Sequence, residues 1–338
     1  STSSSVNTTA VGYTLSEAIA SGSVVWTRTS GTEDNSSPHT AALAGTELNA
    51  GARGSAALTN APTLVNGTIY TIAFNGTDAA GNTATQVSVT SITFDTTDPV
   101  ISSVSPSTSS SVNTTAVGYT LSEAIASGSV VWTRTGGTAD GNSPHTAALA
   151  GTELNTGQRA SAVLTNAPTL VNGTIYTIAF NGTDAGGNAA TEVSVTGITF
   201  DTTAPTIIAS TTIASDNSTA TVTFSEAVFD TNGGSGALEA TDFTLSISGG
   251  VATLGAATPT SISISGNAYT LGFNLSGTPT GAETLRIVPS SATAIYDAAG
   301  NAASTSQSNN TITLNDQLSP TMTITAAEGS DGFTSNNS

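Results

Sequence analysis

The chain contains no cysteine and no lysine, and histidine occurs only twice. The missing cysteines exclude a disulfide scaffold, a zinc finger, an Fe–S cluster, a c-type haem and a cysteine nucleophile. A Lys–Asn isopeptide cross-link is excluded because it needs a lysine. Long hydrophobic runs are absent as well: none approaches the ~18–20 residues of a membrane span, and the first residues do not have the pattern of a signal peptide.

Positive charge is scarce. Five arginines stand against 23 acidic residues in 338, which gives a formal net charge of −18. A field of this sign repels phosphate backbones and anionic lipids, so we expect neither nucleic-acid binding nor membrane insertion. A surplus of carboxylates can instead bind hard divalent cations, above all Ca²⁺. Both ends of the chain lie within a repeated pattern, so we interpret it as a segment of a longer protein.

A repeat of 106 residues organises the sequence. Residues 1–99 align with residues 107–205 without gaps and with 13 mismatches. A diverged third copy keeps TFSEA at 223–227, DAAGN at 297–301 and the spacing from Asp316 to Pro320, after which TMTIT resembles a further start. We therefore predict a first repeat without its first strand at 1–98, a second at 99–204, a third at 205–319 and the start of a fourth at 320–338.

Short segments of alternating apolar residues predict β-strands within each repeat. In the second repeat we expect them at 99–104, 114–121, 128–134, 146–150, 159–165, 174–181 and 190–200. The pairs Asn172-Gly173 and Asn181-Gly182 are typical of turns. Short strands with turns every ~8–12 residues over ~100 residues predict a β-sandwich.

Two aromatic residues favour an immunoglobulin-like sandwich. Trp132 lies on the third expected strand, which carries the core Trp of Ig domains. Tyr176 lies near the start of the sixth, where a tyrosine corner ties the chain crossover to the sheet. Trp26 and Tyr70 repeat both features in the first repeat. The third repeat has neither, and Leu285 sits near its corner position, so we expect that corner to be held differently.

These landmarks and the motifs LSEA, DAAGN and DTTxP resemble the bacterial Ig-like repeats of very large cell-surface adhesins. The resemblance covers nearly the whole chain, and the third repeat is most similar to the variant in bacterial surface-motility proteins. It implies an all-β chain of tandem immunoglobulin-like Greek-key β-sandwiches arranged as an extended rod. It also agrees with Ca²⁺ at the junctions, which related repeats commonly carry.

Acidic residues recur at matching positions of the repeats. Glu123 follows the second strand and Asp184 lies between the sixth and seventh, so both belong to the pole where the repeat begins. Asp95, at the end of the preceding repeat, should arrive beside them. We predict that this joint binds Ca²⁺. The predicted ligands of the next joint are Asp201, Glu226 and Asp297, and the corresponding acids at the two ends are Glu17, Asp78 and Asp316.

Two interpretations of these acids stay open at this point. Three unshielded carboxylates repel each other, and Ca²⁺, which takes six to eight oxygens at ~2.3–2.6 Å, removes that conflict. Pro99 and Pro205 favour extended linkers between the repeats. In the alternative, each Asp before Gly-Asn forms only an Asx-turn, Asp95 simply ends a strand, and Glu17 lies on a solvated surface.

No catalytic site is expected. His39 and His145 have no Cys and no second His in their repeats, so we expect exposed or turn-bonded side chains. Paired carboxylates can hydrolyse glycosides, but these acids belong to joints, and aromatic residues make up only 5% of the chain. Arg28 and Arg134, just after the Trp of their strand, are expected to pair with a cross-strand acid.

The sequence thus predicts a structural protein and not an enzyme. We expect a calcium-rigidified stalk segment of a large extracellular adhesin at the bacterial cell surface, which projects a binding tip or transmits force. Its partners would be the neighbouring Ig-like repeats of the same longer chain. A self-assembling filament or surface-layer subunit stays open, because residues after Pro320 resemble the strand that the first repeat does not have. A carbohydrate-binding module is a third option, but it needs an exposed aromatic strip.

Overall fold

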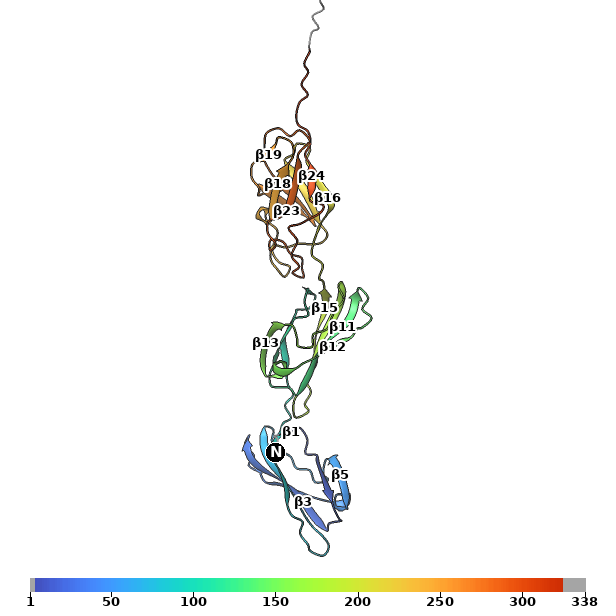
Figure 1. The fold of residues 1–338 in the computed structure, drawn as a ribbon. Coiled ribbons are helices and arrows are strands. Elements are labelled where there is room, and N and C mark those ends of the chain that lie inside the picture. The colour runs from blue at the N-terminus through green and yellow to red at the C-terminus, as the bar shows by residue number, and fades with distance from the viewer. Residues whose placement is uncertain (1–3, 325–338) are drawn as a thin grey trace, which may run out of the picture. The chain divides into compact units, whose positions relative to one another are not determined.

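The computed structural model describes residues 4–324, apart from the side chains of residues 209–211. The chain divides into two compact units, residues 1–202 and residues 203–338. Strands form nearly all the regular structure of the described residues, and the helical elements there are short 3-10 turns. The predicted all-β class, with tandem immunoglobulin-like β-sandwiches, is therefore confirmed (Figure 1).

Residues 4–94 of the first unit form two sheets. Their elements are β1 (Ser4–Val6), β2 (Val11–Leu15), β3 (Ser21–Gly31), β4 (His39–Ala42), η1 (Gly45–Leu48), β5 (Gly51–Ala56), β6 (Thr68–Thr77) and β7 (Val87–Phe94). One sheet has the order β1-β7-β6-β3-β4, and the other contains β2 and β5. Successive side chains of a strand point to opposite faces, so β3 and β6 turn alternate residues into the space between the sheets.

Residues 101–200 repeat this arrangement with one strand more. The elements are β8 (Ile101–Ser105), β9 (Ser111–Val112), β10 (Val117–Leu121), β11 (Ser127–Gly137), β12 (His145–Ala148), η2 (Gly151–Leu154), β13 (Gly157–Ala162), β14 (Thr174–Thr183) and β15 (Val193–Phe200). One sheet has the order β12-β11-β14-β15-β9 and the other β13-β10-β8. The extra strand is β8, which pairs antiparallel with β10.

The expected strands of the second repeat agree with the observed ones within a few residues, but two predictions need correction. The two-residue strand β9 pairs parallel with β15 and was not predicted, because it is too short to show a period. Asn181-Gly182 lies inside β14 and is not a turn. A Cβ at Gly182 would lie 2.9 Å from Cδ1 of Ile125, so close packing explains this glycine. Asn172-Gly173 does turn, and Gly173 has φ +74°.

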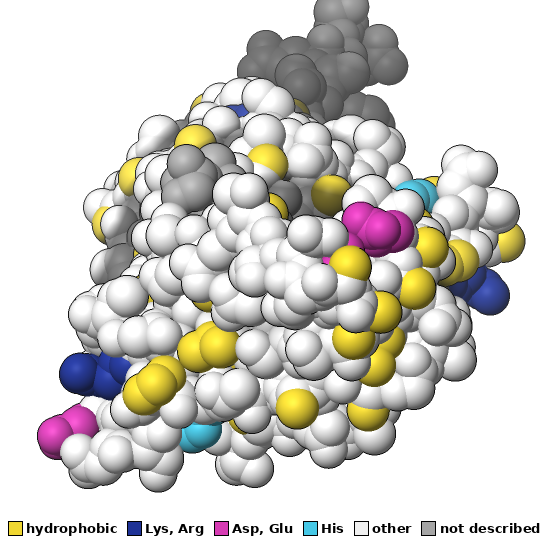
Figure 2. All heavy atoms as spheres, turned by 90° about the horizontal axis from the view of Figure 1, so that it is seen from below, with side chains coloured by type: hydrophobic (Ala, Val, Ile, Leu, Met, Phe, Trp, Pro, Cys, Tyr) yellow, Lys and Arg dark blue, Asp and Glu magenta, His cyan; other side chains and the backbone are white. Residues whose placement is uncertain are grey.

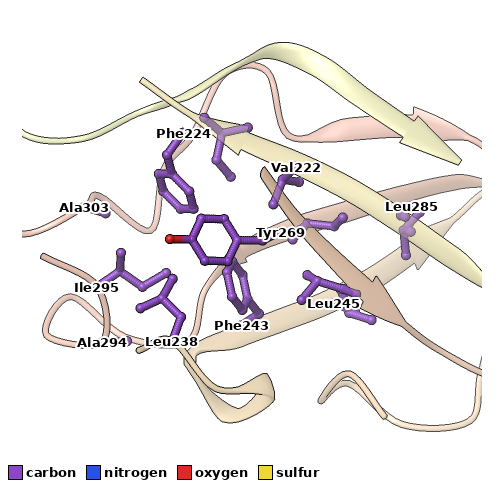
Figure 3. Packing of buried hydrophobic residues seen from close by; sticks show 14 of the residues in the cluster. Val222, Phe224, Leu238, Phe243, Leu245, Tyr269, Leu285, Ala294, Ile295 and Ala303 are labelled. Carbon is purple, nitrogen blue, oxygen red and sulfur yellow. The ribbon is translucent and has the colours of Figure 1, made fainter. Parts of the chain in front are cut away.

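The second unit contains three small sheets. Its elements are β16 (Ile207–Ile213), β17 (Thr219–Phe224), η3 (Ala240–Asp242), β18 (Phe243–Ser248), β19 (Thr253–Leu254), β20 (Ser261–Ser265), β21 (Ala268–Gly272), β22 (Leu275–Ser276), β23 (Thr284–Pro289) and β24 (Thr311–Thr313). The sheet orders are β16-β17-β21-β20, β18-β23-β24 and β19-β22. Figure 3 shows its core, where Tyr269 lies between Phe224 and Phe243 with ring centroids 5.7 and 6.1 Å away.

Each repeat of the first unit has its own apolar core built around one tryptophan. Trp26 and Trp132 are 1% and 0% exposed, as their place on the third strand predicted. Each packs edge-on against the corner tyrosine of its repeat, with centroids 6.0 Å apart for Trp26–Tyr70 and 5.9 Å for Trp132–Tyr176. This T-shaped contact is a favoured aromatic geometry, and it joins β11 to β14 in the second repeat.

Tyr176 forms the predicted tyrosine corner. Its hydroxyl accepts a hydrogen bond from the backbone N–H of Val171 at 3.1 Å and donates one to Oδ2 of Asp140 at 2.7 Å. Nε2 of His145 lies 2.6 Å from the same oxygen. The hydrogen bonds from Tyr176 and His145 lower the pKa of the buried Asp140 to about 2. The equivalent group in the first repeat consists of Val65, Tyr70, Asp34 and His39.

The histidines have the expected kind of partner, whereas the arginines do not. The His145 side chain, at the start of β12, is only 13% exposed and is bonded to Asp140 in the loop before that strand, which agrees with the turn-bonded alternative. Its partner Asp140 was not predicted, because Asp and His five residues apart have no fixed contact in a loop. Arg134 does not pair with a cross-strand acid: its Nε and Nη2 donate to the carbonyl oxygens of Thr138 and Gly137, each at 2.8 Å. Arg28 makes the same contacts with Thr32 and Gly31.

The second unit holds the corresponding region through a carboxylate. Leu285 is fully buried and has no polar group to contribute. Two residues earlier, the buried Glu283 accepts hydrogen bonds from the N–H groups of Val251, Ala252 and Thr280 at 2.8 to 3.0 Å. These backbone hydrogen bonds lower the pKa of Glu283 to about 2. The expectation that this repeat is held differently is therefore confirmed.

We expect the double change Tyr70→Phe and Tyr176→Phe to destabilise the first unit by about 1–3 kcal/mol per repeat, because it removes a donor from a buried carboxylate. Urea unfolding followed by tryptophan fluorescence measures this, since both tryptophans belong to the first unit. The matched control is Tyr13→Phe with Tyr119→Phe, whose hydroxyls donate only to the carbonyl oxygens of Glu47 and Glu153. Equal losses in the two double variants would contradict the role given to the corner.

Candidate metal centre

Charged side chains are sparse on the surface. On the face in Figure 2 they are few, and the hydrophobic side chains form small groups among polar atoms. A place where several carboxylates meet is therefore unusual in this molecule. The first unit contains one, formed by Asp95, Glu123 and Asp184.

The loop between β14 and β15 positions Asp184. The backbone N–H of Asn188 donates to Oδ1 of Asp184 at 2.8 Å, and Nδ2 of Asn188 donates to Oδ2 at 2.8 Å. Gly187 has φ +93°, which lets this short loop close. The hydrogen bonds of an Asx-turn, which the alternative interpretation expected for these aspartates, are therefore present. They leave further lone pairs on both oxygens, because a carboxylate has about four acceptor sites.

Asn188 also fixes the end of the preceding repeat. Its Nδ2 donates to the backbone carbonyl of Asp95 at 2.9 Å, and its Oδ1 accepts a hydrogen bond from Nδ2 of Asn7 at 3.1 Å. The N–H of Asp95 in turn donates to the carbonyl of Val6 at 2.9 Å. The Asn188 side chain thus links the residue that follows β1, the segment after β7 and the loop after β14. The sequence analysis overlooked Asn7 and Asn188, although Asn188 belongs to the DAGGN motif.

The three predicted carboxylates of the first joint meet in the structure. Asp95, Glu123 and Asp184 each offer an oxygen within 4.8 Å of the others. Asp184 is 5% exposed, whereas Asp95 and Glu123 are half-buried. Two oxygens on opposite sides of a Ca²⁺ ion lie about 5 Å apart, so this spacing fits three ligands of one ion.

The electrostatics of the site show that the carboxylates repel each other. Burial raises the pKa of Glu123, and the negative charges of Asp95, Asp184 and Asp98 raise it further. Burial also acts to raise the pKa of Asp184, but the hydrogen bonds from Asn188 and the loop N–H groups outweigh it and the pKa is lowered. At neutral pH the site therefore concentrates negative charge on oxygen atoms alone, a donor set that suits a hard cation such as Ca²⁺ or Mg²⁺.

The predicted ligands of the next joint are shared between the two units. Glu226 follows β17 and Asp297 lies in a loop before β24, and in the second unit each offers an oxygen within 4.8 Å of the other. Asp297 is fully buried, and Asn301 binds both its oxygens as Asn188 binds those of Asp184. Asp201 follows β15 in the first unit. Its approach to Glu226 and Asp297 stays a prediction.

The remaining predicted ligands are Glu17, Asp78 and Asp316. Glu17 is exposed, and Asp78 forms the same loop hydrogen bonds with Asn82 as its counterparts do. Asp316 accepts a hydrogen bond from the N–H of Leu318. Within residues 4–324, Glu17, Asp78 and Asp316 belong to no group of three metal-ligating side chains.

Comparisons with known proteins identify the repeated module. Residues 95–202 match the bacterial Ig-like domain family, a range that contains Asp95, Glu123 and Asp184 together. No curated protein matches the chain in sequence. The part of the chain that the structure describes contains no helix long and apolar enough to cross a membrane.

Two solved structures are similar to the chain over most of its length. One is that of the chicken CNTN1 FN1–FN3 domains, with a TM-score of 0.27 and 11% identity, covering 92% of this chain and 96% of that one. The other is a tetra-tandem repeat in the extending region of a large adhesion protein, with a TM-score of 0.26 and 18% identity, covering 92% of this chain and 73% of that one.

We expect Glu123→Gln to stabilise the metal-free first unit at pH 7 by about 0.5 kcal/mol, because it removes one of three repelling charges. The raised pKa of Glu123 means that its charged form is disfavoured in the folded state, so the repulsion is present above that pKa. It is lost below about pH 4, where the residue is protonated in both states. Urea unfolding in EDTA, followed by tryptophan fluorescence, measures the gain against pH. Glu17→Gln, at an exposed position, is the control, and an equal gain there would contradict the repulsion.

Proposed function

We propose that this chain, which carries tandem bacterial Ig-like repeats, is a stalk segment of a large extracellular adhesin at the bacterial cell surface. Such a segment holds a binding tip away from the cell or transmits force to it. Its partners are the neighbouring Ig-like repeats of the same longer chain. The extending region of a large adhesion protein, to which the chain is similar, is named for a role of this kind.

The fold supports a structural role over a catalytic one. Ig-like domains are typically structural modules. The side chains of this chain that are best suited to catalysis, a His–Asp pair, have a structural role instead. Asp140 is hydrogen-bonded to both His145 and Tyr176, and the Tyr176 ring packs against the core Trp132. This His–Asp pair is therefore part of the tyrosine corner, which ties the chain before β14 to its sheet.

The observation that carries the proposal is the meeting of Asp95 with Glu123 and Asp184. Asp95 comes from the segment that leaves the first repeat, and the other two come from the second, so one ion bound by all three would link both. We propose that this ion is Ca²⁺ and that Asp201, Glu226 and Asp297 bind a second one. Linking two repeats through a shared ion removes freedom from the intervening chain, in the way a cross-link does. The joint then resists bending.

The test is a calcium titration of the 338-residue chain by calorimetry, with small-angle scattering in calcium and in EDTA. We expect heat of binding and a narrower distribution of sizes in calcium, because the joints stiffen. Asp184→Asn should bind one ion fewer per chain than the wild type, since the first joint loses a charged ligand. Glu17→Gln should bind as the wild type does. Absence of heat, with scattering unchanged by EDTA, would overturn the proposal.

A further inference from the structure

The second unit exposes one edge of the strand β20. This strand lies at the end of the sheet β16-β17-β21-β20 and pairs with β21 on one side. Among the described residues, no strand pairs with its other side. Ile264 is 47% exposed, and Ser261, Ser263 and Ser265 are exposed as well. An edge strand presents backbone N–H and C=O groups with which a further strand can pair.

The usual protection of a strand edge is missing from β20. Natural edges are blunted by charged side chains, proline or bulges. In the first unit, the sheets that contain β2 and β10 end in β5 and β13, which carry Arg53 and Arg159. At the other edge of the β20 sheet, the pairing of β16 with β17 is irregular between Ile208 and Thr212. β20 has no charge and no proline, and its register with β21 is unbroken.

The sequence around β20 is also uncharged. Residues 243–282 contain no acidic or basic side chain, and no other stretch of the chain without charge is as long. The chain as a whole has a formal net charge of −18, so two copies repel each other wherever their carboxylates meet. A contact through β20 brings two copies together at a part of the chain that adds nothing to this repulsion.

The sequence of β20 is complementary to itself in an antiparallel pair. Residues 261–265 read Ser-Ile-Ser-Ile-Ser in both directions. If two copies pair about Ser263, Ile262 of each copy lies opposite Ile264 of the other, and serines lie opposite serines. Directly opposite side chains are on the same face of a sheet and contact each other. Ile262 packs against the core of its own unit, so the second copy would extend that apolar surface over the exposed Ile264.

We propose that β20 is a homophilic contact, at which it pairs antiparallel with β20 of a second copy of this chain. The two four-stranded sheets then continue into each other across the contact. Both copies use the same strand, so the contact is isologous and closes as a two-fold dimer. The two strands run in opposite directions. On the proposed stalk function such a pair suits stalks that meet from facing cells, whereas the pairing itself does not depend on that function.

Cross-linking through introduced cysteines tests this pairing, because the chain has no cysteine of its own. Directly opposite residues of an antiparallel pair have Cα atoms about 4.5–5.5 Å apart, a separation that a disulfide spans. The 338-residue chain with Ser263→Cys should therefore form covalent dimers with oxidised glutathione in EDTA, as non-reducing gel electrophoresis measures. Ser261→Cys and Ser265→Cys should each stay monomeric alone, because each position is opposite the other. Their equimolar mixture should cross-link.

A charge on the edge strand supplies the second measurement. Ile264→Lys changes a side chain that is already 47% exposed, and circular dichroism checks that the variant is folded. Combined with Ser263→Cys, it should slow cross-linking roughly 10-fold, because two cross-strand isoleucine pairs are lost from each dimer. The matched control is Val163→Lys, at a 58% exposed position of the first unit, which should leave the rate unchanged.

Three outcomes would overturn the pairing of β20. They are no dimer with Ser263→Cys, equal cross-linking at all three serine positions, and a rate that Ile264→Lys leaves unchanged. EDTA keeps calcium out of these measurements, so each of these failures leaves the stalk proposal standing.

Discussion

The first unit depends on the contacts of residues 95–105, the segment that leads from the first repeat into the second. Its first part brings Asp95 to Glu123 and Asp184, and Asn188 holds it there through the backbone carbonyl. Its second part, β8, covers the edge of β10 and buries Ile101 in the core. One short segment therefore both joins two repeats and completes the second. The pattern of a proline followed two residues later by an apolar residue, as in Pro99 and Ile101, recurs at Pro205 and Pro320.

Buried carboxylates hold loops and strands together in this chain, which has no cysteine and no lysine. Asp140 collects hydrogen bonds from Tyr176 and His145, and Glu283 collects three backbone N–H groups. Both have a strongly lowered pKa, since each is charged and fully bonded in the folded state. Glu123 is the opposite case, because its neighbours are acids and its pKa is raised. The carboxylates thus fall into two groups. Asp140 and Glu283 accept hydrogen bonds from the protein itself, whereas Glu123 lies among other carboxylates, a setting that suits a bound cation.

The proposed stalk depends on the joint between the two repeats of the first unit. A stalk needs stiff joints, and the acids of the first joint lie where an ion would fix the segment between two sandwiches. The same segment supplies β8, the strand that pairs with β10 and completes the second sandwich.

Much of this could be read from the sequence, because it depends on short-range pattern and on repetition. Alternating apolar residues indicated the strands, Trp132 and Tyr176 indicated the type of sandwich, and strand order alone placed Asp95 near Glu123 and Asp184. Contacts between loops could not be read in this way. The bonds of His145 to Asp140, of Arg134 to carbonyl groups and of Asn188 to Asp95 depend on how loops close, and Asn181-Gly182 became part of a strand because Ile125 packs against it. Periodicity determines which face of a strand is buried, whereas only the folded chain decides which polar groups then meet.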